Sequence, residues 1–517
     1  MHLQSSLELD EESFGYFLSN EMRELLSLSY LLSQQTSIDN IHRPLIGKLH
    51  LEATRCEEIM DYYGSKQNRY WYPFRQTIAV TKSFTTIAYN LLHIKKTAPL
   101  YNLREVNVDF LSETDNVLLI ILNSLIQNAS TMIKIAYKKK ITIDKSGYLI
   151  ERFAELFPEG RLKNDRKRRK TRFPSRIAIN LATSFLNLAE ESRILKIYKK
   201  ISKRDYRSCI PEIISEEHMR ILENKFHNLQ SIYDTHLQQS DIAQHDKSLP
   251  VLRGQVSVVY HLLETATVLV HYIERHSSYF SRKWKYRRHI EEGQCMTVLM
   301  EYFISNCDRF IVSSQEVCRT VLRQYSEPGT ITVNIPNYRG FHVRPSTLLS
   351  KIVLHYGGNV KMMLYDQVYD ASMPLELFRA NEVINSIKRQ YAAKQIMDHQ
   401  LIKKLKLNKV SSGEMKKKLR IIFLDLLQQK TLLIYENTFS FEELDPLDDE
   451  NLIDYVKRAI TTYLALGKID IASDLTVTFT GDKRVLKDIK TLAENGYGED
   501  LFGNNIVLPS ELSYLRR

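Results

Sequence analysis

The chain has few cysteines, and their spacing excludes two classes of site. None of the five forms a CxxC pair, and they lie at Cys56, Cys209, Cys295, Cys307 and Cys318. An odd number of widely spaced cysteines argues against a disulfide framework and is typical of reduced thiols in a cytoplasm. Cys307 and Cys318 fall in a helical pattern, where we expect core side chains rather than metal ligands. The sequence therefore calls for no metal and no bound cofactor.

The sequence also lacks a membrane signature. No run is long and apolar enough to cross a bilayer, and residues 1–10 lack the charged-then-apolar pattern of a signal peptide. We therefore expect a cytoplasmic protein with no membrane span. Its 43% hydrophobic and 26% charged residues are those of a folded soluble protein, and 517 residues predict several domains.

The first 325 residues have the pattern of long amphipathic helices. Apolar residues recur at spacings of three and four, so each helix has a face to bury. The predicted helices are 21–33, 44–63, 74–95, 116–137, 175–201, 216–233, 254–275 and 295–325. Long helices with short connections favour bundles. We predict two helical bundles, 1–145 and 173–325, joined by a basic linker, 146–172.

A weak internal repeat links the two predicted bundles. Arg75 and His93 have the same spacing as Arg253 and His271, and the next helix follows at a similar distance in both halves. The second bundle is therefore a possible duplicate of the first. Convergence of two ordinary amphipathic helices explains the match nearly as well.

The net charge of +11 is concentrated in two basic runs, residues 161–172 and 282–289. Such runs attract phosphate backbones, anionic lipids or acidic protein surfaces. Trp284 and Tyr286 interleave with the second run, which is a modest signal for base stacking. Solvated loops between helices are the commoner explanation. Binding of nucleic acid is therefore not the function that we predict.

The most informative segment is the hexapeptide Gly340-Phe341-His342-Val343-Arg344-Pro345. Before it, residues 331–335 alternate as in a strand, and Pro336 closes that strand. After it, apolar residues recur at helical spacing until Gly357-Gly358. The pattern thus sets His342 at the start of a helix, with Pro345 in the first turn, where its missing N–H costs little.

A histidine in this position can carry a phosphoryl group. We expect the early N–H groups of the helix, here those of Val343, Arg344 and Ser346, to lack intrahelical partners and to face an added anion. A neutral ring nitrogen of His342 is a nucleophile, and Arg344 would clamp the dianionic group. We therefore predict His342 and Arg344 as catalytic residues and the backbone of Val343 and Ser346 as phosphate-stabilising. A capped helix with a surface histidine and arginine is the alternative.

From Gly329 onward the chain resembles HPr, the histidine-containing phosphocarrier protein of the bacterial sugar phosphotransferase system, whose motif reads Gly-Leu-His-Ala-Arg-Pro. The likeness continues through residues 359–364 and 368–372 and resumes at 467–500. It implies the order strand, helix, strand, strand, short helix, strand, helix, forming an open-faced β-sandwich. It also implies that His342 is the phosphorylated residue, that Arg344 is its partner, and that enzyme I is a plausible donor.

The chain departs from this family in two places. A long insert with a helical pattern, residues 381–466, interrupts the HPr-like domain, 329–505, where the family has only a short helix and loop. The stretch 373–380 stands where HPr docks on its partners, and its composition differs, so the usual partners need not fit. The expected fold is thus a mostly α N-terminal region followed by an α+β HPr-like domain with a helical insert.

Ser372 stands where some HPr proteins carry a regulatory phosphorylation site. A phosphate there would add about two negative charges near a helix start. A serine in that place is also a routine helix N-cap, which is the interpretation that we favour.

These observations predict a protein that accepts a phosphoryl group on His342 in a phosphoenolpyruvate-dependent phosphotransferase system, a carrier rather than a turnover enzyme. No nucleotide-binding glycine loop occurs, so the chain is not expected to make its own phosphoryl donor. The alternative is a non-catalytic regulatory scaffold that uses the HPr-like domain to bind proteins. Nothing near His93, His261 or His271 resembles the acidic neighbour that a histidine kinase or transfer domain places beside its reactive ring, so we expect these histidines at core or boundary positions.

Overall fold

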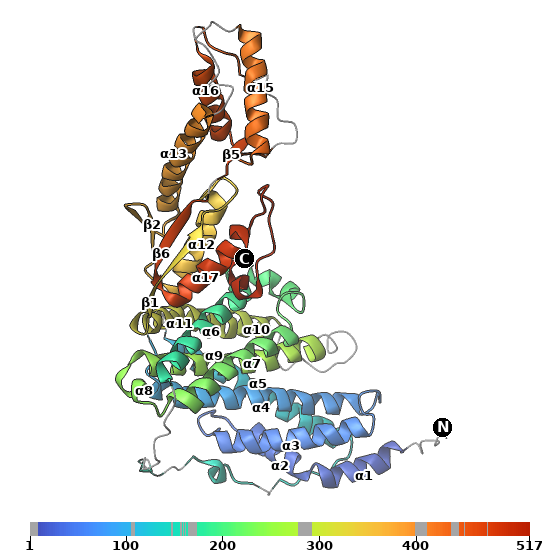
Figure 1. The fold of residues 1–517 in the computed structure, drawn as a ribbon. Helices are drawn as coiled ribbons and strands as arrows, with labels where there is room; N and C mark the ends of the chain where they lie inside the picture. The colour runs from blue at the N-terminus through green and yellow to red at the C-terminus, as the bar shows by residue number, and fades with distance from the viewer. Residues whose placement is uncertain are drawn as a thin grey trace, which may run out of the picture. The chain divides into compact units, whose positions relative to one another are not determined.

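The computed structural model describes residues 9–516 apart from 105–108, 146–147, 156–157, 159, 161, 164–172, 278–291, 399–410, 436–443, 449 and 473. The protein is mostly α-helical, as predicted, with one four-stranded antiparallel sheet (Figure 1). It divides into two compact units, Met1–Val321 (unit 1) and Leu322–Arg517 (unit 2). The second basic run, and most of the first, lie outside the described residues.

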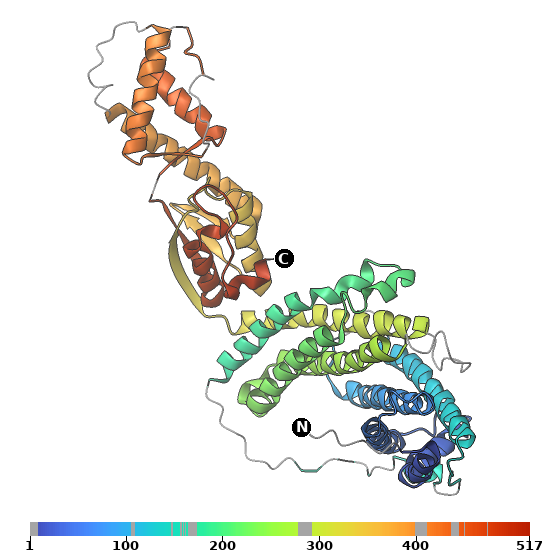
Figure 2. The same ribbon diagram turned by 90° about the vertical axis from the view of Figure 1, so that its right-hand side faces the viewer.

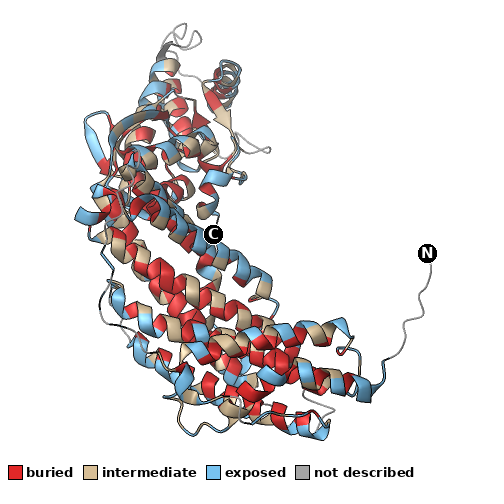
Figure 3. Cartoon of the chain, turned by 90° about the horizontal axis from the view of Figure 1, so that it is seen from below, coloured by how far each residue is buried: buried red, intermediate tan, exposed pale blue. Residues whose placement is uncertain are grey.

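Unit 1 is built from helices, so residues of both predicted bundles lie in one compact unit. Its α-helices are α1 (Glu11–Glu21), α2 (Arg23–Ser33), α3 (Arg43–Tyr62), α4 (Tyr72–Thr97), α5 (Phe110–Lys138), α6 (Pro174–Glu191), α7 (Glu216–Ile232), α8 (Asp241–His245), α9 (Ser248–Tyr272), α10 (Glu292–Thr297) and α11 (Ser305–Gln324). The pairs α3–α4, α4–α5, α7–α9 and α4–α9 are packed together. Buried residues gather where these helices face one another (Figure 3).

The two halves of unit 1 share one local arrangement. Arg75, at the start of α4, pairs with Asp61 at the end of α3, with Nε and Oδ1 2.8 Å apart. Arg253, in the first turns of α9, pairs with Asp234 just beyond α7 at 3.0 Å. A duplication would explain why, in both halves, an arginine in the first turns of one helix pairs with an acid at or just beyond the end of an earlier helix. The duplication itself stays a prediction.

The expectation that no segment is long and apolar enough to cross a bilayer is wrong for two helices of unit 1. Residues Phe110–Lys138 and Ser248–His276 are long and apolar enough, by length and composition, to cross a membrane. Within the unit, however, 56% and 72% of their most apolar windows are buried. Burial of this extent is typical of core helices in a soluble protein, so both are weak candidates for membrane spans.

Unit 2 alternates strands and helices. Its elements are β1 (Pro328–Asn334), α12 (Val343–Tyr356), β2 (Lys361–Leu364), β3 (Gln367–Asp370), α13 (Pro374–Asp398), α15 (Ser412–Gln428), β4 (Leu432–Ile434), α16 (Leu452–Ala465), β5 (Ile469–Ile471), β6 (Thr476–Asp482) and α17 (Lys483–Glu494). The main sheet is antiparallel, in the order β1-β6-β2-β3, and β4 pairs with β5 separately. The two strands farthest apart in sequence, β1 and β6, are therefore neighbours.

The core of the main sheet follows from the alternation in its strands. Val333 faces Val477 across β1 and β6, and Met362 faces Phe479 across β2 and β6. All four side chains are buried. Helix α17 packs on β1 and β6 and contacts α12, so the apolar faces of both helices close the core.

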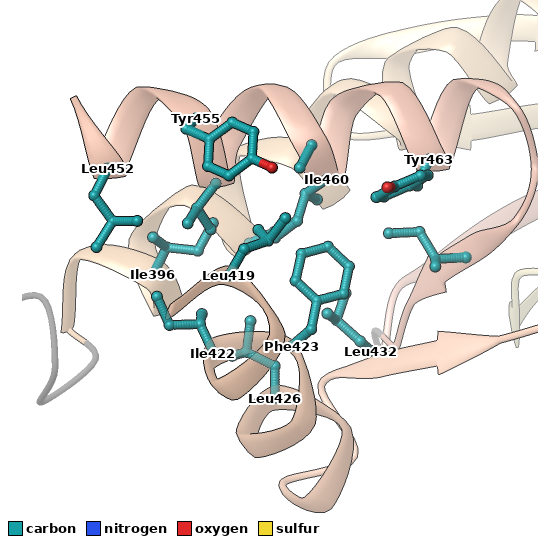
Figure 4. Close-up of a cluster of buried hydrophobic side chains, with 14 of the residues drawn as sticks. Ile396, Leu419, Ile422, Phe423, Leu426, Leu432, Leu452, Tyr455, Ile460 and Tyr463 are labelled. Carbon is teal, nitrogen blue, oxygen red and sulfur yellow. The ribbon is translucent and has the colours of Figure 1, made fainter. Parts of the chain in front are cut away.

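The insert has a hydrophobic core of its own (Figure 4). This core gathers buried side chains from α13, α15, β4, α16 and β5. Residue 381, where we placed the start of the insert, lies inside α13, and this helix continues from the sheet into the insert (Figure 2). The insert is also not wholly helical, because β4 lies within it. Part of the helical pattern that the sequence shows in the insert, residues 399–410, lies outside the described residues.

Candidate functional site

His342 is the N-cap residue of α12, as the hexapeptide predicts. Two left-handed residues, Arg339 and Gly340, with φ of 53° and 61°, turn the chain from the end of β1 into this helix. Gly340 also has a neighbour that excludes a side chain, since an added Cβ would lie 2.2 Å from Oδ1 of Asn381. The glycine of the motif is thus required both by its backbone angles and by close packing.

Polar contacts hold the loop before His342, and they come from α13 and from the insert with its C-terminal flank. Asn381 of α13 accepts a hydrogen bond from the N–H of Phe341 at 2.9 Å and donates one to the carbonyl of Arg339 at 3.1 Å. The guanidinium of Arg339 donates to the carbonyl of Gly467 at 2.8 Å. Tyr435 donates to the carbonyl of Asn337 at 3.2 Å. The insert therefore helps to set the backbone that presents His342.

The ring of His342 lies at the surface but has one engaged nitrogen. Its side chain is 24% exposed, and Nε2 lies 2.8 Å from Oε2 of Glu499, whose side chain is only 6% exposed. The ring of Tyr338 meets the imidazole edge to face, with centroids 5.5 Å apart. Among the described residues, Nδ1 has no hydrogen-bond partner. Nε2 is thus hydrogen-bonded to a buried carboxylate, while Nδ1 is available to react.

A tight turn after α17 places Glu499 beside the ring of His342. Gly496, Tyr497 and Gly498 all have positive φ, and a Cβ on Gly498 would lie 2.9 Å from Leu348 of α12. The buried Tyr497 anchors the turn, because its hydroxyl donates to the carbonyl of Asn334 at 2.7 Å. Burial raises the pKa of this hydroxyl well above its usual range. Glu499 therefore sits on fixed backbone.

Arg344 faces the same carboxylate. Its Nε lies 3.8 Å from Oε1 of Glu499, and its side chain is 35% exposed. This buried Nε has no hydrogen-bond partner among the described residues. His342, Arg344 and Glu499 form a charged cluster at the start of α12, with Arg344 able to turn toward a further anion.

The backbone prediction needs one correction. The N–H of Ser346 donates to the carbonyl of His342 at 3.2 Å, which makes it the first hydrogen bond of the helix. Because His342 is the N-cap, the free N–H groups are those of Val343 and Arg344, and Pro345 has none. Ser346 is instead structural: its side chain is fully buried and donates to the carbonyl of Phe341 at 2.9 Å.

Ser372 is not the N-cap that we favoured. The N–H groups of Glu376 and Leu377 donate to the carbonyl of Met373, so α13 begins one residue later than a cap at Ser372 requires. The hydroxyl of Ser372 donates instead to Oδ1 of Asp370 at 2.7 Å, and this bond lowers the pKa of that carboxyl. A phosphate on Ser372 would stand beside an existing negative charge. Its phosphorylation stays a prediction.

The histidines of unit 1 are partly buried, and tertiary structure gives them neighbours that the sequence did not show. The rings of His93 and His261 lie 4.6 Å apart, and burial and the nearby His261 lower the pKa of His93 to about 4. Nδ1 of His271 lies 2.8 Å from the carboxylate of Glu216, which is on another helix. Nδ1 of His261 lies 3.2 Å from the carboxylate of Glu264, three residues along the same helix. Acidic neighbours are therefore present, contrary to the sequence expectation.

Sequence reasoning missed Glu499 and Asn381, the two residues that fix the ring and the loop of His342. The available signal for Glu499 was its place directly after Gly496-Tyr497-Gly498, a glycine-rich segment that forms a tight turn just beyond α17. No protein-family model matches the chain, and no curated protein or solved structure matches it either.

Proposed function

We propose that this protein is a phosphocarrier or regulatory protein that accepts a phosphoryl group on His342 in a phosphoenolpyruvate-dependent phosphotransferase system. The observation that carries the proposal is the placement of His342. His342 is the N-cap residue of α12, and its ring is partly exposed and lies beside Arg344. Its Nδ1 has no hydrogen-bond partner in the part of the chain that the structure describes. A nucleophilic nitrogen next to free N–H groups and a guanidinium is a suitable acceptor for a dianionic group.

The order of elements in unit 2 supports the HPr-like assignment of residues 329–505. The chain runs β1, α12, β2, β3, α13 and then, after the insert, β6 and α17. This is the order that the likeness to HPr implies, with the long α13 where that family has a short helix. His342 and Arg344 then occupy the positions of the phosphorylated residue and its partner.

The electrostatics of the site favour a reversible adduct. The positive end of α12 contributes on the order of 1 kcal/mol to an anion at its N-terminus. Charge-assisted hydrogen bonds from Arg344 would contribute about 1.5–3 kcal/mol, reduced because its side chain is about one-third exposed. Glu499 opposes a second anion, but it lies at Nε2, on the side of the ring away from Nδ1. Such a balance suits a carrier, which must also release the group.

The wider role follows from the same proposal. Because the chain has no nucleotide-binding glycine loop, the donor is another protein, such as enzyme I, and both would meet in the cytoplasm. The helices of unit 1 would read or transmit the phosphorylation state to a regulated protein. These two roles would explain why a carrier domain is joined to a large helical region.

Incubation of the full-length protein with phosphoenolpyruvate and enzyme I tests the proposal. We expect an acid-labile, base-stable adduct that His342→Ala abolishes. His218→Ala is the matched control, because His218 is exposed on α7 and its loss should leave the adduct intact. Circular dichroism checks that each variant is folded.

Absence of an adduct from enzyme I, with folding intact, would favour the second candidate function. In that case the HPr-like domain is a protein-binding module of a regulatory scaffold. Two observations favour this alternative: the insert itself, and the exposed large apolar side chains Met373 and Leu375 at the start of α13.

A further inference from the structure

We propose that Glu499 is a positioning residue that keeps the proton of His342 on Nε2, so that Nδ1 is the nucleophile, and that makes the resulting adduct easier to transfer. This inference rests on the proposed function, because it concerns the same ring. It deepens that function by assigning a role to a residue 157 positions away in sequence.

The carboxylate of Glu499 presents one oxygen to the ring of His342 and the other to Arg344. Glu499 is nearly fully buried, and its Oε2 lies 2.8 Å from Nε2 of His342. A carboxylate only accepts hydrogen bonds, so Nε2 must donate. The other oxygen, Oε1, faces Arg344. The buried Tyr497 fixes the backbone just before Glu499. A neutral imidazole held in this way carries its lone pair on Nδ1.

The transfer step then needs no proton to move. The lone pair of Nδ1 attacks phosphorus, and the bond between phosphorus and the donor breaks with its electron pair leaving on the donor. The ring becomes a cation, with the phosphoryl group on Nδ1 and the proton still on Nε2, and the carboxylate of Glu499 balances this charge. In the reverse direction an acceptor attacks phosphorus, and the electrons of the P–N bond return to Nδ1.

The retained proton decides how readily the adduct reacts. If Nε2 keeps its proton, the departing ring is a neutral imidazole, whereas a deprotonated ring would have to leave as an anion. Glu499 therefore activates the P–N bond at neutral and mildly alkaline pH. A charge-assisted hydrogen bond of this kind corresponds to a rate factor of roughly 10- to 100-fold.

The test uses the full-length protein and potassium phosphoramidate, a small-molecule donor that needs no docking surface. Phosphorus NMR identifies the substituted nitrogen, with His342→Ala as background. We expect substitution at Nδ1 in the wild type. In Glu499→Gln we expect a mixture of Nδ1 and Nε2 adducts and a hydrolysis rate at pH 8 that is roughly 10- to 100-fold lower, with the acid-catalysed limb moved to lower pH. A purely structural role for Glu499 would change neither the substituted nitrogen nor the pH profile.

Glu494→Gln is the matched control, because it removes the same charge from an exposed side chain at the end of α17. It should behave as the wild type. If Glu499→Gln fails to fold, the wild type labelled with ¹⁵N-histidine still decides the point: Nε2 of His342 must carry the proton and Nδ1 must not.

An unchanged site of substitution and an unchanged pH profile in folded Glu499→Gln, or a proton on Nδ1 in the wild type, would overturn the inference. Failure of the proposed function is a different result. In that case the wild type takes no phosphoryl group at His342 from enzyme I, while the ¹⁵N measurement still reports the tautomer.

Discussion

Replacement of Gly340 by alanine tests how the loop of His342 is held, independently of any phosphoryl chemistry. The new Cβ would lie 2.2 Å from Oδ1 of Asn381, so the asparagine must move away. It would then lose its hydrogen bonds with the N–H of Phe341 and the carbonyl of Arg339. The alanine would also have to adopt a φ near +61°.

The magnitude follows from these two effects. A left-handed backbone costs a residue with a Cβ roughly 1–2 kcal/mol. Two lost hydrogen bonds add about 0.5–1.5 kcal/mol each. We therefore expect Gly340→Ala to reduce the free energy of unfolding of unit 2 by about 3 kcal/mol. With a urea slope of about 2 kcal/mol per molar, the midpoint of unfolding should fall by roughly 1.5 M.

Urea unfolding can be followed for unit 2 alone because neither tryptophan of the chain lies within the residues of unit 2, Leu322–Arg517, and Trp71 is buried in unit 1. The transition of unit 2 is the part of the circular dichroism change that occurs without a change in tryptophan emission. Gly413→Ala is the control, since its Cβ would meet nothing in the first turn of α15. It should raise stability slightly, by about 0.4–1 kcal/mol.

A double-mutant cycle then separates clash from backbone strain. In an Asn381→Ala background no side chain opposes the new Cβ, so Gly340→Ala should cost only the backbone strain of roughly 1–2 kcal/mol. The reasoning is refuted if Gly340→Ala changes the midpoint no more than Gly413→Ala does, or if its cost is the same with and without Asn381.

Two further predictions concern the insert and unit 1. Leu419→Ala, at a fully buried position of α15, should lower the free energy of unfolding of the insert by about 2–5 kcal/mol. Leu424→Ala, at a half-exposed position of the same helix, should change this free energy by less than about 1 kcal/mol. Urea titration compares the two variants, and equal effects would show that Leu419 is not part of a packed core. Burial lowers the pKa of His276 to about 4. Between pH 6.5 and 4 this histidine therefore binds a proton more readily in the unfolded chain than in the folded one. As the pH falls through this window, the free energy of unfolding of unit 1 should decrease by up to about 3 kcal/mol. In His276→Gln this share of the pH dependence, followed by tryptophan emission, should disappear, and an unchanged slope would show that His276 is protonated in the folded state.

Features of the site that depend on local sequence could be predicted. The alternation in 331–335 indicated a strand, and the structure has β1 at Pro328–Asn334. The helical spacing after His342 and the stop at Gly357 indicated α12, which ends where Gly357 adopts a φ of 61°. Both signals come from residues close in sequence, where backbone preference and the apolar pattern agree.

Features set by tertiary contacts could not be predicted. The partner of the His342 ring comes from beyond α17, and nothing near the hexapeptide indicates it. The roles of Ser346 and Ser372 depended on which residue caps the helix, and a shift of one position exchanges a free N–H for a bonded one. The length of α13 was also missed, because its second half packs on the insert rather than on the sheet.

The insert is part of the structure that supports the site of His342, rather than an independent appended domain. A buried ion pair, Lys388 of α13 with Asp470 of β5 at 2.8 Å, joins it to the helix that also carries Asn381. Asp470 in turn accepts a hydrogen bond from Tyr435 at 3.0 Å, and burial together with this carboxylate raises the pKa of the tyrosine hydroxyl well above its usual range. The ring of Tyr435 contacts Tyr338, which contacts His342. The ion pair, the hydrogen bond and the two ring contacts thus form a continuous chain from the insert to His342. The position of the His342 ring therefore depends on the insert being folded.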